Sequence, residues 1–163
     1  MENGRLVLAG MVGLALLGPA GAADPSAKGR QIQIELRLLR GDPLGSPEQG
    51  TAKVLTRPTL QMLEKQEGRV FTGQRVRVAG EMRGVGNGFR AVAESAAGGK
   101  LRLRVTVELS RVVEDPTTGQ PAVRTELAHF TREAKPGEML RVRVGKRAGK
   151  ETWVEMRARE VKE

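Results

Sequence analysis

The sequence predicts an all-β fold, a compact antiparallel sheet or sandwich of about eight to nine strands. Three observations carry this prediction. Hydrophobic and polar residues alternate with a period of two, turn sequences rich in glycine and proline separate the alternating segments, and only one short segment is a candidate helix. Such alternation is typical of strands with one buried and one solvated face.

Residues 101–109 form the clearest predicted strand. One face carries only Leu and Val, whereas the other carries Arg102, Arg104, Thr106 and Glu108. The same alternation occurs in residues 32–38, 75–78, 140–144 and 154–158. We therefore expect these five segments to be strands, joined mostly as antiparallel hairpins.

Turns are predicted where Gly, Pro, Asn and Asp cluster, at residues 41–43, 84–88, 98–100, 115–121 and 135–137. The candidate helix is residues 59–66, because Pro58 suits the first turn of a helix. A pair of short strands explains the same residues equally well, so both alternatives stay open at this point.

The N-terminus has the pattern of a secretory signal peptide, residues 1–22. Arg5 precedes an uncharged run of 12 residues, 6–17, and the small residues Ala20-Gly21-Ala22 follow as a cleavage site. The run is too short to span a bilayer, and a buried first helix is the alternative. We expect an exported protein of the periplasm or cell envelope, with a flexible segment at residues 23–31, a single β-domain at residues 32–163 and no membrane span after cleavage.

Composition excludes several classes of protein. The 163 residues carry 28 Lys and Arg against 19 Asp and Glu, a net charge of +9, with one His and no Cys. The lack of Cys excludes a disulfide framework, a thiolate nucleophile and a zinc–thiolate site. The charged fraction of 29% is too high for a multispanning membrane protein.

The residues offer no constellation for catalysis. Asp24, Asp42 and Asp115 each precede a proline, which is the context of a turn. His129 lies in a strand-like stretch, where period two separates it from Glu126. The sequence therefore predicts a protein that is not an enzyme and that uses no metal or cofactor.

Arginine occupies the polar phase of several predicted strands, notably at Arg75, Arg77, Arg102, Arg104, Arg141 and Arg143. If these strands are neighbours, the guanidinium groups form a stripe that would attract anionic polymers. A solvated face that prevents aggregation is the simpler interpretation. Nucleic acid is not an expected partner, because few aromatic residues are present to stack on bases and the chain is predicted to be exported.

Residues 53–73, KVLTRPTLQMLEKQEGRVFTG, resemble the core motif of the bacterial secretin family, the outer-membrane channels of type II, type III and related secretion systems. The match rests on Lys53, Val54, Leu55, Pro58, Leu60, Phe71 and Gly73. In the family this stretch pairs two strands across a turn. Residues 32–39, 89–113 and 124–140 resemble further family segments in the right order.

The resemblance also has departures. Only residues 41–52 separate the first strand from the Pro58 motif, where channel-forming secretins have a longer segment with membrane-spanning hairpins. We expect no N-terminal ring-building domains before the core. The resemblance therefore implies a short secretin-like β-domain and not a complete channel.

We expect a non-catalytic assembly or protein-interaction module of the cell envelope or a secretion system. Its partner would be another protein or a second copy of the chain. The alternative is a binder of anionic envelope polymers through the arginine-rich strand faces.

Overall fold

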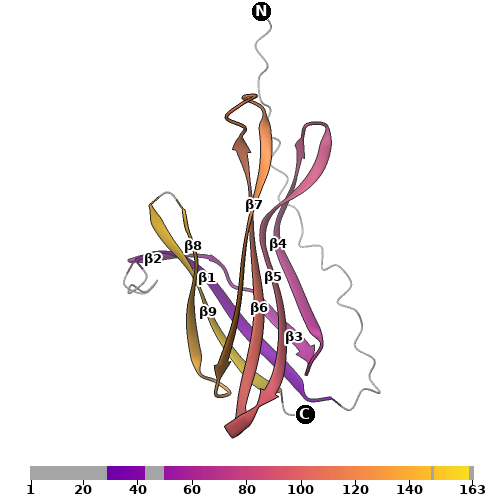
Figure 1. Cartoon of the computed structure of the whole chain (residues 1–163), viewed down its shortest axis with the longest axis vertical. Coiled ribbons are helices and arrows are strands. Elements are labelled where there is room, and N and C mark those ends of the chain that lie inside the picture. Colours follow the sequence, from indigo (N-terminus) through magenta and orange to yellow (C-terminus); the bar gives the residue numbers. More distant parts are fainter. Residues whose placement is uncertain (1–28, 43–49, 148, 162–163) are drawn as a thin grey trace, which may run out of the picture.

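The computed structural model describes residues 29–42, 50–147 and 149–161. The predicted signal peptide and residues 23–28 of the predicted flexible segment lie outside the described residues, whereas Gln31 already belongs to the first strand. Within the described part the chain forms strands and one 3-10 turn (Figure 1). In order these are β1 (Gln31–Gly41), β2 (Ala52–Thr56), β3 (Thr59–Leu63), β4 (Glu67–Val78), β5 (Glu81–Ala96), η1 (Ala97–Gly99), β6 (Lys100–Glu114), β7 (Pro121–Ala134), β8 (Met139–Arg147) and β9 (Lys150–Val161).

The strands make two antiparallel sheets, which confirms the predicted all-β class. In the first sheet β2 and β3 both pair with one edge of β1. The other edge of β1 pairs with β9, and β9 pairs in turn with β8. In the second sheet the order is β4-β5-β6-β7. The hairpins β4–β5 and β6–β7 extend beyond the first sheet at one end of the molecule (Figure 1).

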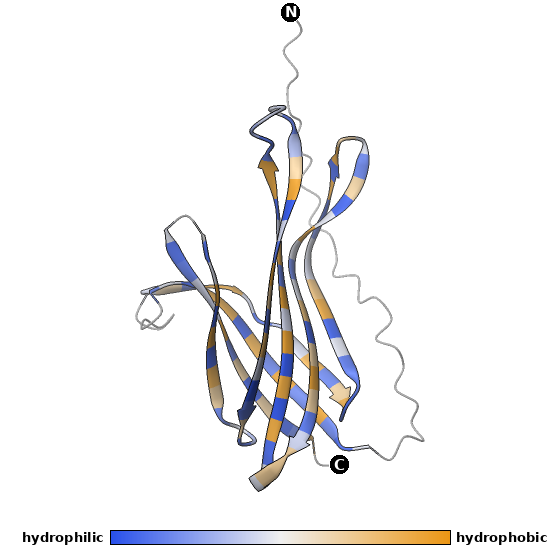
Figure 2. Ribbon diagram, viewed as in Figure 1, coloured by the Kyte–Doolittle hydropathy of each residue, from blue (hydrophilic) through white to orange (hydrophobic). Residues whose placement is uncertain are grey.

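The core lies between the two sheets, because the aliphatic phase of each strand faces the opposite sheet. Figure 2 shows the alternation of hydrophobic and hydrophilic residues along the strands. From the first sheet the core receives Ile32, Ile34, Leu36, Leu38, Leu60, Met62, Val142, Val154, Met156 and Ala158. From the second sheet it receives Phe89, Ala91, Ala93, Leu101, Leu103, Val105 and Val107. All five segments predicted from alternation lie in strands.

The first sheet also buries side chains on its outer face, the face turned away from the second sheet. Leu39, Ala52 and Trp153 form a separate small cluster there, with Val54 packed against it. Leu39 and Trp153 are register partners on β1 and β9. Residues 38 and 39 therefore face opposite sides of the sheet, and both are buried because each side has its own apolar cluster.

The predicted turn at residues 84–88 is wrong, since these residues belong to β5. The turn lies instead at Ala79 and Gly80, between β4 and β5. Gly86, one of these glycines, lets the β5 backbone approach the β4 backbone closely at Gly73. A Cβ placed on Gly73 would come within 2.9 Å of Gly86 Cα and closer still to the carbonyl oxygen of Val85. Glycine-rich sequence here indicates a tight strand pair, not a turn.

Residues 59–66 form a strand and a turn, so the helical alternative is excluded. The hairpin implied by the motif is also absent from the ladders, because β3 pairs with β1 whereas β4 pairs with β5. The chain crosses from the first sheet to the second at the turn between β3 and β4. Gly68 packs closely against the Met62 side chain at this crossing, since a Cβ on Gly68 would lie 2.7 Å from Met62 Cε.

Candidate interaction surfaces

Five of the seven secretin-like motif residues lie at the edge of the first sheet, beside β1. Lys53, Val54 and Leu55 lie in β2, and Leu60 lies in β3. Pro58 is buried between β2 and β3, and its carbonyl oxygen accepts a hydrogen bond from the Leu36 backbone N–H at 3.0 Å. This bond ties the β2–β3 connection to the central strand β1. These five residues therefore hold the edge of the first sheet.

Phe71 and Gly73, the remaining motif residues, lie in β4. Phe71 is on the outer face of the second sheet, with its side chain 48% exposed. Its ring lies over a floor of glycines, because Cβ atoms added to Gly73, Gly84 or Gly88 would meet it at 2.8–3.7 Å. A single exposed apolar side chain is common on protein surfaces, so what distinguishes Phe71 is its position on an open edge strand.

Leu127 on β7 lies in the same cross-strand row as Phe71. The register pairs are Phe71 with Gly88, Gly88 with Glu108, and Glu108 with Leu127. Leu127 is 56% exposed. The two exposed apolar side chains therefore lie at opposite edges of one sheet, at the same height along the strands.

Both edges of the second sheet are open within the described residues. β4 pairs only with β5, and β7 pairs only with β6. The strands are 12 and 14 residues long, so each presents an extended row of backbone N–H and C=O groups. Such edges are templates for pairing with another strand.

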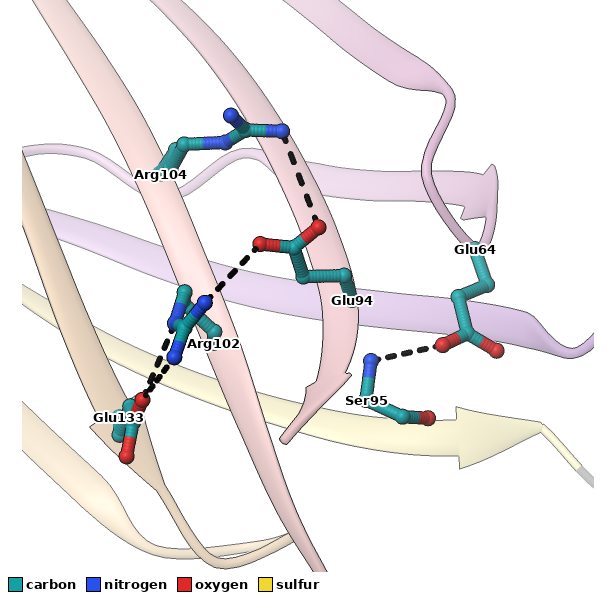
Figure 3. A network of polar contacts seen from close by, with 6 residues as sticks. All are labelled: Glu64, Glu94, Ser95, Arg102, Arg104 and Glu133. Atoms are coloured by element: carbon teal, nitrogen blue, oxygen red, sulfur yellow. Dashed lines mark hydrogen bonds and ion pairs between the residues drawn. The ribbon is translucent and has the colours of Figure 1, made fainter. Parts of the chain in front are cut away.

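Ion pairs cover the outer face of the second sheet near η1. Figure 3 shows Arg102 between Glu94 and Glu133, and Arg104 beside Glu94. Arg102 Nη2 lies 2.8 Å from Glu133 Oε1, and Arg104 Nη2 lies 3.9 Å from Glu94 Oε2. The hydrogen bond and charge of Glu133 raise the pKa of Arg102 above its ordinary value. Both arginines therefore have acidic partners on neighbouring strands.

Glu64 ties the crossing turn to the end of β5. Its carboxylate accepts a hydrogen bond from the Ser95 backbone N–H at 2.6 Å (Figure 3). Hydrogen bonds from Ser95, side chain first and then backbone, lower the pKa of Glu64 below the ordinary value of 4.5. The charges of Arg30 and Lys65 act in the same direction.

This lowered pKa predicts a pH-dependent contribution to stability. A carboxylate with a depressed folded-state pKa stabilises the fold above 4.5, and the contribution is lost as pH falls through the folded-state pKa. Between about pH 6 and pH 3 the wild type should lose more unfolding free energy than Glu64→Gln. Urea unfolding at a series of pH values measures this difference.

The matched control for that experiment is Glu114→Gln. Glu114 is exposed and makes no hydrogen bond or ion pair in the part of the chain that the structure describes. Its variant should follow the wild-type pH dependence. Identical pH profiles for wild type and Glu64→Gln would contradict the role assigned to Glu64.

Arg141 and Arg143 lie on the outer face of the first sheet. Glu155 is nearly buried there, between Arg37 and Arg141 on the adjacent strands. Arg37 Nη2 is 2.6 Å from Glu155 Oε2, and Arg141 Nε donates to Glu155 Oε1 at 3.0 Å. The Arg141 guanidinium also lies 5.6 Å from the Trp153 ring centroid, and Arg143 pairs with Glu151 at 2.5 Å.

The six arginines singled out from the sequence therefore do not form one stripe. Arg102 and Arg104 lie on one outer face of the sandwich, and Arg141 and Arg143 lie on the opposite one. Arg75 and Arg77 lie on the projecting β4–β5 hairpin, exposed and without an ion pair among the described residues. The sequence gives the phase of each arginine along its strand, but not which sheet the strand joins.

The outer face of the second sheet also carries a shallow depression of about 460 Å³ around His129. His129 Nδ1 lies 2.9 Å from the Thr106 hydroxyl, so this histidine is held by its cross-strand neighbour. Within residues 29–42, 50–147 and 149–161, no group of three or more His, Asp or Glu side chains could hold a metal ion. Among the same residues, no helix is long and apolar enough to cross a membrane.

Solved structures with a similar fold are secretins, so the described part of this chain has a secretin-like fold. They include the type II secretin GspD of enteropathogenic Escherichia coli, at a TM-score of 0.58 and 12% identity over 83% of this chain and 70% of that one. GspD of E. coli K12 has a TM-score of 0.58 and 14% sequence identity, over 83% of this chain and 51% of that one. The type IV competence pilus secretin PilQ of V. cholerae has a TM-score of 0.55 and 11% sequence identity, over 83% of this chain and 62% of that one.

No protein-family model and no curated protein sequence matches this chain. The similarity to secretins is therefore one of fold. It agrees with the resemblance seen in residues 53–73, which now have a position at the crossing between the sheets.

Sequence reasoning missed two features of these surfaces. The Phe71–Leu127 row depends on the register of four strands, which no local pattern gives. The burial of Glu155 could not be seen either, because Glu155 occupies a polar phase that looks like any solvated position.

Proposed function

We propose that this chain is a non-catalytic assembly module of the bacterial cell envelope, exported through its N-terminal signal peptide. Copies of it associate through the two edges of the second sheet. The observation that carries the proposal is the pair of open edges, β4 and β7, with Phe71 and Leu127 exposed in one row. The secretin-like fold supports the same function, since the comparable solved proteins are a type II secretin and a type IV competence pilus secretin.

The strand directions permit a continuous sheet between copies. All neighbouring strands in the second sheet are antiparallel, so β7 runs antiparallel to β4. When one copy is placed beside another without rotation, its β7 edge meets the neighbour's β4 edge as an antiparallel pair. Leu127 of one copy then lies beside Phe71 of the next, and an aromatic–aliphatic cross-strand pair is favourable.

Such an interface is heterologous, because different edges of the two copies meet. Heterologous contacts continue from copy to copy and close into a ring or extend into a filament. Other envelope proteins can use the same edges. One comparable structure is a complex of the secretin GspD with the pilotin AspS, so a protein partner of this kind is included in the proposal.

Light scattering coupled to size-exclusion chromatography tests the proposal. The purified protein should elute as oligomers, and Phe71→Ser with Leu127→Ser should shift it toward monomer. The matched control is Met82→Ser, which removes another exposed apolar side chain, at the tip of the β4–β5 hairpin. A wild-type protein that is monomeric at every concentration tested would reject self-association.

Binding of anionic polymers is the second candidate function, and Arg75 and Arg77 favour it. Their guanidinium groups are exposed on a projecting hairpin and have no acidic partner among the described residues. The other four arginines are already paired with glutamates.

This pairing predicts a difference between variants on a heparin column. Arg75→Ser with Arg77→Ser should lower the salt concentration needed for elution more than Arg141→Ser with Arg143→Ser, although both remove two charges. Equal shifts would mean that net charge alone determines retention, and would remove the support for a polymer site on the hairpin.

A further inference from the structure

The depression on the outer face of the second sheet gathers cationic side chains around Thr106. Thr106 lies on β6, and its register partners are Arg90 on β5 and His129 on β7. Arg104 precedes Thr106 by two residues on β6, so it has the same outward phase. Side chains at such neighbouring and diagonal positions have Cβ atoms roughly 5–8 Å apart. Arginine and histidine side chains at these positions therefore reach a common point above Thr106.

The protein itself neutralises the two arginines only loosely. Arg90 Nη2 lies 4.0 Å from Glu108 Oε2, and Arg104 Nη2 lies 3.9 Å from Glu94 Oε2. Glu94 is moreover shared, because Arg102 Nη1 lies 3.7 Å from its other oxygen. At these separations neither Arg90 nor Arg104 donates a hydrogen bond to its acid. The guanidinium N–H groups of both residues therefore stay available to a ligand.

The lining of the depression adds little negative charge. Glu67 is the one acid among the residues that line it. Arg69, two residues further along β4, holds the Glu67 carboxylate in an ion pair. Adjacent like charges without close acids are unfavourable in a sheet, so Arg90 and Arg104 together favour an anion between them.

His129 offers a third contact from a third strand. Its Nδ1 lies 2.9 Å from the Thr106 hydroxyl, which holds the ring in place. Nε2 has no hydrogen-bond partner in the part of the chain that the structure describes. The residue is exposed, so this nitrogen is accessible to a ligand in the depression.

The arrangement of these groups selects the kind of anion. A carboxylate has two oxygens in one plane, which a single arginine satisfies through two parallel hydrogen bonds. Groups that approach from three strands suit a tetrahedral anion, whose oxygens point in several directions, and arginine is well suited to bind phosphate. The depression, about 460 Å³, is much larger than one phosphate group, so it has room for part of the molecule that carries the phosphate.

We propose that this depression binds a phosphate group, held by Arg90, Arg104 and His129. The phosphate can belong to a soluble phosphorylated molecule or to a lipid headgroup. The site uses the outer face of the sheet and not the backbone of its edges, so it does not depend on the proposed assembly.

Titration calorimetry in phosphate-free buffer tests the proposal. Glycerol 3-phosphate serves as the soluble probe, and vesicles of phosphatidylglycerol with phosphatidylcholine serve as the lipid probe. Sodium acetate at equal ionic strength and vesicles of phosphatidylcholine alone are the controls. Saturable binding of glycerol 3-phosphate identifies a soluble source, binding of the anionic vesicles alone identifies a headgroup, and binding of both means that the phosphate itself is recognised.

The histidine gives a second, local readout. His129 is the only histidine in the chain, so its imidazole proton signals are identified directly by NMR. These signals should shift in a saturable way as the phosphate probe binds, with the same midpoint as the calorimetric titration. Binding without any shift of the His129 signals would place the phosphate elsewhere and overturn the proposal.

The variants separate this site from general charge attraction. Arg90→Gln and Arg104→Gln should each weaken phosphate binding about tenfold. The matched control is Arg157→Gln, which removes one exposed arginine from the outer face of the first sheet and should leave the affinity unchanged. Acetate binding as tight as that of phosphate, the same loss of affinity in all three variants, or no saturable binding of any phosphate probe would overturn the proposal.

Discussion

Replacing Phe89 with alanine is expected to lower the free energy of unfolding by about 3–5 kcal/mol. Phe89 is 1% exposed and lies on β5, at the centre of the core between the sheets. Its register partners are Val70 on β4 and Val107 on β6. Removal of the ring leaves a cavity that these strands cannot fill, because their backbones are fixed by ladder hydrogen bonds on both sides of β5.

The same substitution at Phe71 is the matched control for that measurement. Phe71 lies on the outer face of the same sheet with about half of its surface in solvent. Phe71→Ala should change the free energy of unfolding of the monomer by roughly 1 kcal/mol or less. Urea unfolding at low protein concentration gives both values. Similar losses for the two variants would contradict the assignment of inner and outer faces.

Gly73→Ala is expected to destabilise the second sheet by about 1–3 kcal/mol, although alanine is otherwise a small change. The added methyl group would meet backbone atoms of Val85 and Gly86 on β5, which cannot rotate away as a side chain can. The β4–β5 pair must therefore separate at this position. Because Gly73 lies two residues from Phe71 on the same strand, we also expect weaker self-association.

Gly84→Ala is the control in the same ladder. A methyl group there meets only the Phe71 ring, at an ordinary contact distance of 3.7 Å. Thermal unfolding should show a lower melting temperature for Gly73→Ala and little change for Gly84→Ala. The reverse order would mean that the close approach of β4 and β5 is not a constraint on the fold.

Much of this fold was predictable because the core is built from alternation. The aliphatic phase of residues 101–109 faces inward in β6 as predicted, and the polar phase faces solvent. The glycines of residues 84–88 misled the prediction, because glycine is favoured both in turns and where two backbones approach closely. Only the three-dimensional pairing of Gly73 with Gly86 separates these two roles.

The candidate surfaces were less predictable, because they depend on which strands become neighbours. Arg102 and Arg141 follow the same local pattern, yet they lie on opposite sides of the sandwich. Phe71 and Leu127 are 56 positions apart in the sequence and share a row only through the registers of β4 to β7. Local periodicity determines the face of a side chain within its strand and carries no information about such long-range pairing.

A cysteine cross-link between the two edges tests the central claim most directly. The chain contains no cysteine, so Phe71→Cys with Leu127→Cys introduces the only two thiols. Within one copy these positions are three strand spacings apart, roughly 14 Å, which exceeds the reach of a disulfide. Edge-to-edge pairing places them side by side in neighbouring copies. Under mild oxidation we expect a ladder of dimers and larger oligomers on a non-reducing gel, whereas Met82→Cys with Leu127→Cys should give far less. A single monomer band for the Phe71–Leu127 pair would contradict assembly through these edges.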